Sequence, residues 1–123
     1  MRQLVKVLEA LSYETRLRIL NLLLERECCV CEMEWVLGIS ESAASRNLKA
    51  LYDVDIIKQK RAKTWTLYQI NDEDIPQYYS KLIDIIREAT RDNSIIETDR
   101  EKLRKLEPMV LCNVTRRELS LRK

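Results

Sequence analysis

The sequence contains no histidine and only one glycine, and each shortage excludes whole classes of protein. Without histidine the chain cannot form a Ser-His-Asp triad, a Cys-His catalytic pair or a histidine-ligated zinc site. A loop that cradles phosphates needs several glycines, so Gly38 alone excludes dinucleotide-binding and P-loop folds. No apolar run approaches the roughly 18 residues of a membrane span, and Arg2 and Lys6 interrupt the amphipathic start. We therefore expect a cytoplasmic protein with no signal peptide and no membrane partner.

The residues that are present fit one small globular domain. A chain of 123 residues supports a single modest core, and 46% apolar with 34% charged residues is typical of a soluble protein. The formal net charge of +2 neither favours nor excludes nucleic acid, so the placement of the charges matters more. The four cysteines are Cys28, Cys29, Cys31 and Cys112. In a cytoplasmic protein such clustering suggests metal or redox chemistry rather than a structural disulfide.

Apolar periodicity predicts four helices in the first half of the chain, at about residues 3–11, 13–26, 30–37 and 41–53. Ser12 is expected to cap the second helix, Gly38 to end the third and Ser40 to cap the fourth. A short helix, a glycine-containing turn and a helix with small polar residues form the pattern of a helix-turn-helix.

The pattern changes after Val54. Residues 64–70 alternate strictly and are rich in β-branched and aromatic side chains, which predicts a strand paired through a tight basic turn with the strand before it. A long helix is expected at about residues 75–93. The predicted fold is mainly α with a β-hairpin wing: four helices, two strands and a fifth helix, which is a winged helix-turn-helix.

The last long helix carries more apolar surface than so small a domain can cover. The residues of this surface are Ile75, Tyr78, Tyr79, Leu82, Ile83, Ile85, Ile86 and Ala89. The first helix, around Leu4 and Val7, is similar. We therefore predict a homodimer through the first and last long helices, which would present two recognition helices to a palindromic site. The alternative is that the tail folds back over this surface. The predicted units are a DNA-binding and dimerisation domain at 1–95 and a charged helical tail at 96–123.

The fourth helix and the hairpin offer side chains suited to duplex DNA. Arginine pairs with guanine and asparagine with adenine in the major groove, a helix N-terminus can hold a phosphate, and a basic hairpin tip can reach a neighbouring phosphate. The predicted DNA-contacting residues are Ser40, Ser42, Ser45, Arg46, Asn47, Lys49, Lys58, Lys60, Arg61 and Lys63. Two alternatives are that these are ordinary solvated charges, and that the winged helix serves only protein contacts.

Four segments resemble the ArsR/SmtB family of metal-responsive repressors in their order and spacing. They are residues 10–20 (ALSYETRLRIL), 29–32 (CVCE), 40–48 (SESAASRNL) and 65–68 (WTLY), and the resemblance spans about residues 1–90. It implies a winged-helix dimer that represses its own operon and releases the operator DNA when an inducer binds. The sequence departs from the family in its tail and at residues 53–55, where a glycine is common before the wing.

The pair Cys29 and Cys31 resembles the arsenic-sensing branch, which uses three thiolates from a Cys-x-Cys-x-x-Cys run. Glu34 stands at the third position, so Cys28 is the nearest candidate for the third ligand and Cys112 the other. Trivalent arsenic and antimony suit three thiolates, which a helix N-terminus favours. Residues two apart on a regular helix point to nearly opposite sides, so binding through Cys29 and Cys31 requires irregular backbone.

Other functions remain open for these thiols. Cys29 or Cys31 could form a disulfide or polysulfide bridge with Cys112, which would make the protein a redox- or sulfide-responsive repressor. Cadmium, lead or monovalent copper are alternative inducers. An enzyme would need an acid or base beside the thiols, and only Glu32 and Glu34 are near, so we expect no enzyme.

Overall fold

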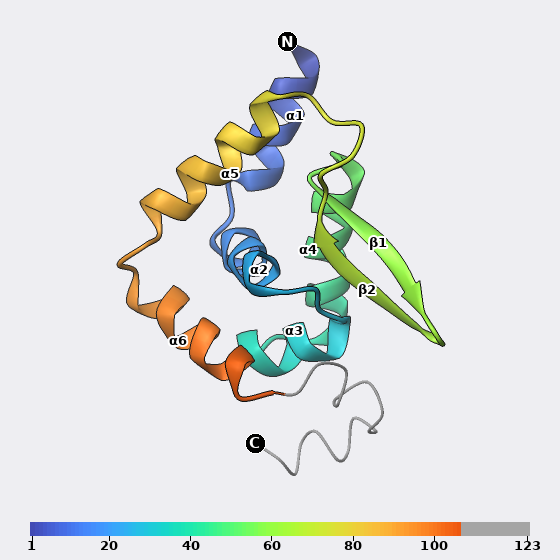
Figure 1. The fold of residues 1–123 in the computed structure, drawn as a ribbon, viewed down its shortest axis with the longest axis vertical. Helices are drawn as coiled ribbons and strands as arrows, with labels where there is room; N and C mark the ends of the chain where they lie inside the picture. Colours follow the sequence, from blue (N-terminus) through green and yellow to red (C-terminus); the bar gives the residue numbers. More distant parts are fainter. Residues whose placement is uncertain (107–123) are drawn as a thin grey trace.

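The computed structural model describes residues 1–106 and has the architecture of a winged helix-turn-helix (Figure 1). The elements are α1 (Arg2–Leu11), α2 (Glu14–Glu25), α3 (Val30–Leu37), α4 (Glu41–Asp53), β1 (Ile57–Ala62), β2 (Trp65–Ile70), α5 (Tyr78–Ala89) and α6 (Ser94–Arg104). The predicted order of four helices, a hairpin and a fifth helix is confirmed, and α6 follows it. Within the described part of the chain, no helix is long and apolar enough to cross a membrane.

Local chemistry fixes the helix-turn-helix formed by α3 and α4. Gly38 ends α3 in the left-handed conformation at φ +67°, where a side chain would be strained. The Ser40 hydroxyl then accepts a hydrogen bond from the Ala43 backbone N–H at 3.1 Å and caps α4, as predicted. The predicted cap at Ser12 is wrong. Tyr13 occupies the cap position of α2, and the Ser12 hydroxyl donates to the Glu9 carbonyl at 2.8 Å, which closes α1 instead.

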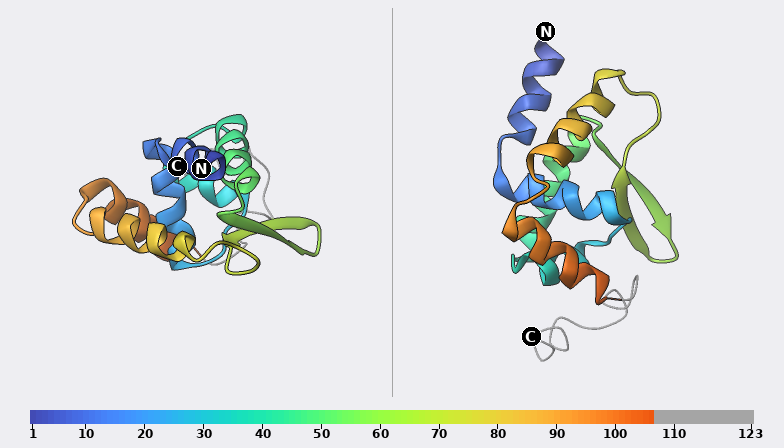
Figure 2. Two further views of the ribbon diagram at one scale, coloured as in Figure 1. Left: turned by 90° about the horizontal axis from the view of Figure 1, so that it is seen from above. Right: turned by 60° about the vertical axis from the view of Figure 1, so that its left-hand side comes forward.

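The core lies around α2, which the other elements surround (Figure 2). Ile19, Leu20 and Leu22 of α2 are fully buried, and α4 contributes Leu48 and Leu51 from its inner face. Burying each such side chain contributes about 1.5–3 kcal/mol to the stability of the fold. Apolar residues therefore recur at helical spacing, and this pattern predicted the helices from the sequence. The opposite face of α4 therefore stays in solvent.

The wing is an antiparallel hairpin that projects from the body of the molecule (Figure 1). Its register pairs Ile57 with Ile70 at the base and Ala62 with Trp65 at the tip. Lys63 in the turn has φ +59°. Before the wing, Asp55 has φ +64°, so the left-handed residue lies within residues 53–55, the segment where the family commonly has a glycine.

The helix predicted at 75–93 is shorter in the structure, because α5 ends at Ala89 and a separate helix, α6, begins at Ser94. The side-chain oxygen of Asn93 accepts hydrogen bonds from the Ile95 and Ile96 backbone N–H groups at 2.9 and 3.1 Å, which caps α6. The domain boundary predicted after residue 95 falls inside α6. Ile96, Asp99 and Leu103 of α6 are buried, so the described residues up to 106 share the core of the domain.

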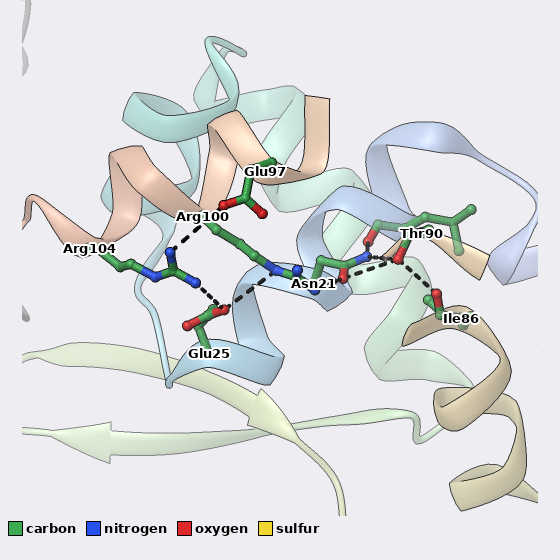
Figure 3. Close-up of polar contacts among 8 residues, drawn as sticks. Asn21, Glu25, Ile86, Thr90, Glu97, Arg100 and Arg104 are labelled. Atoms are coloured by element: carbon green, nitrogen blue, oxygen red, sulfur yellow. Dashed lines mark hydrogen bonds and ion pairs between the residues drawn. The ribbon is translucent and has the colours of Figure 1, made fainter. Parts of the chain in front are cut away.

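Polar contacts join α6 to α2 and to the end of α5 (Figure 3). The buried Asn21 side chain donates to the Thr90 hydroxyl at 3.2 Å and accepts from the Arg100 guanidinium at 2.7 Å. Glu25 pairs with both Arg100 and Arg104, at 3.4 and 3.2 Å. The strongest link lies beside this network: Arg18 makes two parallel hydrogen bonds to Asp99, at 2.8 and 2.9 Å.

Replacing Asp99 with alanine should destabilise the protein by about 3 kcal/mol, because Asp99 is only 2% exposed and its loss leaves Arg18 half-buried without its counter-charge. Urea unfolding followed by circular dichroism measures this change. Asp92→Ala, at an exposed position of the α5–α6 connection, is the matched control and should change stability by less than about 0.5 kcal/mol. Equal effects of the two substitutions would contradict a stabilising role for the ion pair.

Candidate nucleic-acid interface and cysteine segment

The exposed face of α4 presents a short polar stripe. Ser42, Ser45, Arg46 and Lys49 are all exposed and follow the i, i+3, i+4, i+7 spacing of a single helix face. The buried Ala44, Leu48 and Leu51 hold the opposite face against the core. The stripe therefore has the small residues, the arginine and the lysine that a helix needs to approach the floor of a major groove.

Asn47 lies away from this stripe, contrary to the expectation that it faces DNA. Its side-chain oxygen accepts a hydrogen bond from Arg16 Nε at 3.0 Å, and its amide nitrogen donates to the Ala43 carbonyl at 2.8 Å. The oxygen and nitrogen that would together read an adenine are thus both used inside the protein. Ser40 is also engaged, as the cap of α4, although it remains exposed at the helix N-terminus.

Several of the predicted basic DNA contacts are paired with carboxylates of the same chain. Lys49 contacts Asp53 at 2.8 Å, within α4. In the wing, Lys58 contacts Asp72 at 2.7 Å and Lys60 contacts Glu27 at 3.0 Å. The pKa of Lys58 is raised, chiefly by its hydrogen bond to Asp72, which keeps the ammonium charged.

The basic residues nearer the tip of the wing have a different setting. Within residues 1–106, Arg61 donates to the neutral Thr66 hydroxyl at 3.4 Å and is in no ion pair, and Lys63 is exposed in the turn. The wing thus has a charge-balanced base and a more basic tip.

The segment that carries the cysteines is joined to the wing through its backbone. The Cys28 N–H donates to the Tyr68 carbonyl at 3.1 Å, and the Tyr68 N–H donates to the Cys28 carbonyl at 2.8 Å. Tyr68 is in β2, so Cys28 forms an isolated antiparallel bridge at the edge of the two-stranded hairpin. The Glu27–Lys60 ion pair reinforces this contact from β1. A displacement of residues 27–29 therefore acts directly on the wing.

Cys28 is an unfavourable thiolate. Its side chain is fully buried, and this burial raises the pKa of the thiol from its ordinary value of 9.0 to about 12. Its Sγ lies 3.4 Å from the Arg26 carbonyl, as a weak donor would. The predicted role of Cys28 as a metal ligand requires loss of that proton, and its surroundings oppose the loss.

Cys29 and Cys31 lie at the start of α3, where the sequence analysis placed them. Cys29 occupies the N-cap position, and its N–H donates to the buried carboxylate of Glu32 at 3.0 Å. Arg26 donates to the other oxygen of Glu32 at 2.7 Å and reaches the Leu106 carbonyl at 3.5 Å, which connects the segment to the end of α6.

The two thiols at the start of α3 differ in oxidation state. Cys29 is disulfide-bonded, whereas Cys31 is half-buried and is not in a disulfide. Within residues 1–106, no group of three His, Cys, Asp or Glu side chains is arranged to hold a metal ion. The predicted additional ligand Cys112 lies outside the described residues.

A helix-turn-helix that exposes a polar stripe beside a basic hairpin defines the winged-helix class of regulatory proteins. Comparison with known sequences gives the family. Residues 13–59 match the arsR family of bacterial regulatory proteins. The chain is 32% identical over 76 residues to the arsenical resistance operon repressor of Bacillus subtilis, covering 61% of this chain and 72% of that protein. This protein belongs to the arsR family.

The relatives are named for resistance to different elements. A homologue of the cadmium resistance regulatory protein CadC from Staphylococcus aureus is 35% identical over 77 residues, covering 62% of this chain and 64% of that protein. The family thus includes proteins named for arsenic and for cadmium resistance.

Two solved structures resemble the fold closely. The homodimeric winged helix-turn-helix domain of Mb0332 from Mycobacterium bovis superposes with a TM-score of 0.63 at 28% identity, covering 76% of this chain and 82% of that one. Reduced HlyU from Vibrio cholerae gives a TM-score of 0.61 at 25% identity, covering 72% of this chain and 88% of that one.

Sequence reasoning missed the residues that connect the DNA-facing and cysteine-bearing parts. Arg16, Glu27 and Tyr68 each contact an element more than 30 positions away, and no local pattern marks such partners. The pairing of Glu32 with the Cys29 N–H does have a local signal, because a glutamate three residues after a helix cap is typical of a capping box.

Cys28 should resist alkylation in the folded protein. With iodoacetamide at about pH 8, Cys31 should be modified first and Cys28 only after unfolding, since thiolate is the reactive form and Cys28 has a pKa of about 12. Mass spectrometry of native and urea-treated samples measures the two rates. By linkage, the stability contributed by the protonated thiol is complete below pH 9 and lost as pH rises toward 12. Rapid labelling of Cys28 in the native state would contradict the burial argument.

Replacing Glu27 with glutamine should strengthen binding to every duplex several-fold at low salt, because it removes a carboxylate that competes with phosphate for Lys60. The gain should shrink as salt is added, and fluorescence anisotropy across a salt series measures it. Glu88→Gln makes the same charge change at an exposed position of α5 and is the matched control. An equal gain from both variants would mean that only total charge matters.

Proposed function

We propose that this protein is a homodimeric transcriptional repressor that binds palindromic operator DNA and releases it when trivalent arsenic or antimony binds its thiolates. The observation that carries the proposal is the direct backbone connection between the cysteine segment and the wing, at Cys28 and Tyr68. A ligand that rearranges the start of α3 also moves an edge of the DNA-contacting hairpin, so binding and release are linked.

Two matching surfaces support DNA binding as a dimer. The stripe of α4 (Ser42, Ser45, Arg46 and Lys49) supplies base and phosphate contacts, and the wing supplies further cations. On α1, Leu4 and Leu8 are 40% and 49% exposed, and on α5 Ile85 is 60% exposed. Gln3 of α1 donates to the Tyr79 hydroxyl of α5 at 3.2 Å, so these apolar residues lie on two adjoining helices that can pair with a second copy.

The proposed inducer site uses Cys29 and Cys31 with Cys112 as the third thiolate. Burial of Cys28 makes it the weaker candidate, since a soft trivalent ion needs deprotonated sulfur. The disulfide at Cys29 must be reduced before the ion can bind. The relatives named for arsenic and for cadmium both support a soft-metal inducer, and arsenic is the choice that three thiolates favour.

A second candidate is a redox-responsive repressor, which the disulfide at Cys29 favours. Cys28 and Cys31 are not in disulfides, and the proposed partner is Cys112, the remaining cysteine of the sequence. Oxidation by hydrogen peroxide would join the Cys29 and Cys112 sulfurs: the two thiols lose two protons and two electrons, and the peroxide is reduced to two waters. The similarity to HlyU, whose structure is described in a reduced form, supports this alternative.

The two candidates are separated by titrating the reduced protein on its own upstream DNA and following release by fluorescence anisotropy. Arsenite should release the wild type near stoichiometrically, and Cys29→Ser, Cys31→Ser and Cys112→Ser should each abolish the response while Cys28→Ser keeps it. If peroxide releases the DNA instead, and this needs Cys29 and Cys112 but not Cys31, the redox candidate replaces the arsenic one. Release by cadmium but not arsenite would change the metal and keep the site.

A further inference from the structure

Arg16 connects the helix expected at the dimer interface with the helix expected to read DNA. Its Nε donates to the Asn47 side-chain oxygen of α4 at 3.0 Å, and its Nη1 donates to the Ala10 carbonyl in the last turn of α1 at 3.3 Å. The carbonyls of a last helical turn have no partner within the helix, so this arginine satisfies one of them. Its guanidinium also lies 4.0 Å from the centre of the Tyr13 ring, which holds the side chain in place.

The geometry of the guanidinium makes this contact directional. Arginine presents a rigid planar set of donors, so one side chain fixes α1 and α4 relative to each other, which the flexible ammonium of lysine cannot do. Asn47 is fixed in turn, because its amide nitrogen donates to the Ala43 carbonyl of the same helix at 2.8 Å. Arg16 and Asn47 are both only half-buried, so these polar contacts contribute orientation more than core stability.

We propose that Arg16 and Asn47 are positioning residues that set the orientation of the recognition helix α4 relative to the dimer axis, and so the operator half-site spacing that the protein accepts. This inference depends on the proposed function, because only a dimeric DNA-binding protein has a preferred spacing. In such dimers the distance between the two recognition helices corresponds to the distance between half-sites, so a looser α1–α4 contact relaxes the spacing.

The test compares Arg16→Gln, Asn47→Ala, the double variant and Arg16→Lys on the native operator and on operators with one base pair inserted or removed. Each single variant should bind the native operator about tenfold more weakly, equivalent to about 1.4 kcal/mol, and prefer the native spacing less strongly. The double variant should also lose about tenfold rather than a hundredfold, because both changes break the same contact. Arg16→Lys keeps the charge and should not restore the preference.

Arg18→Gln is the matched control, since Arg18 is a half-buried arginine of the same helix that contacts Asp99 of α6 instead. It should lower the thermal unfolding temperature and leave the spacing preference unchanged. Equal relaxation by Arg18→Gln would overturn the inference, because general loosening of α2 would then suffice. If Arg16→Gln does not fold, Asn47→Ala breaks the contact from the other side and gives the same test.

Two further results would also overturn the inference. One is a loss confined to a single base pair in Asn47→Ala, which would restore a base-reading role for Asn47. The other is additive losses in the double variant. Failure of the wild type to bind duplex DNA at all would instead refute the proposed function. This outcome differs from a changed spacing preference, which requires that the protein binds DNA.

Discussion

Two backbone hydrogen bonds between Cys28 and Tyr68 determine how the parts of this molecule can influence one another. Through them the loop between α2 and α3 is bridged to β2, so the cysteine segment and the wing are joined by backbone. The same loop is connected at its other end to α3 by the Glu32 carboxylate and to the end of α6 by Arg26. A change in the loop therefore affects the wing, the helix-turn-helix and α6 together.

The neighbouring cysteines differ chemically because their surroundings differ. Cys28 is fixed in the core by its backbone pairing and keeps its proton, whereas Cys31 is half-buried on the first turn of α3. Cys29 lies between them at the helix cap, where Glu32 restrains its backbone and its sulfur is already in a disulfide. The three cysteines in four residues are thus one buried protonated thiol, one disulfide sulfur and one half-buried thiol.

Most of the fold could be predicted because it rests on local patterns. The 3.6-residue periodicity of α1 to α4, the left-handed Gly38 and the alternation in β2 are each visible within a few residues. The break between α5 and α6 was missed, although Asn93 followed by Glu97 has the composition of a capped helix start. Apolar periodicity continued across the break and favoured one long helix.

The site was predicted less completely, for a physical reason. Residue type indicated which side chains are suited to DNA or to soft metals, but not which of them are already engaged. Asn47 is turned inward by Arg16, and Lys60 is paired with Glu27, over separations of 31 and 33 positions. Burial of Cys28 depends on β2, which lies 40 positions further along the chain. Such pairings are decided by tertiary packing and leave no periodic trace.

The carboxylates beside the wing and α4 have a consequence for how such a protein would search a chromosome. Asp53, Glu27 and Asp72 occupy lysine ammonium groups as phosphates would, so every duplex must first displace an internal substitute. That competition weakens contact with all sequences alike, whereas Arg46 of α4 is in no ion pair within the part of the chain that the structure describes. Few copies of the protein then stay bound to non-specific DNA. Discrimination between DNA sequences depends on the residues that face base edges.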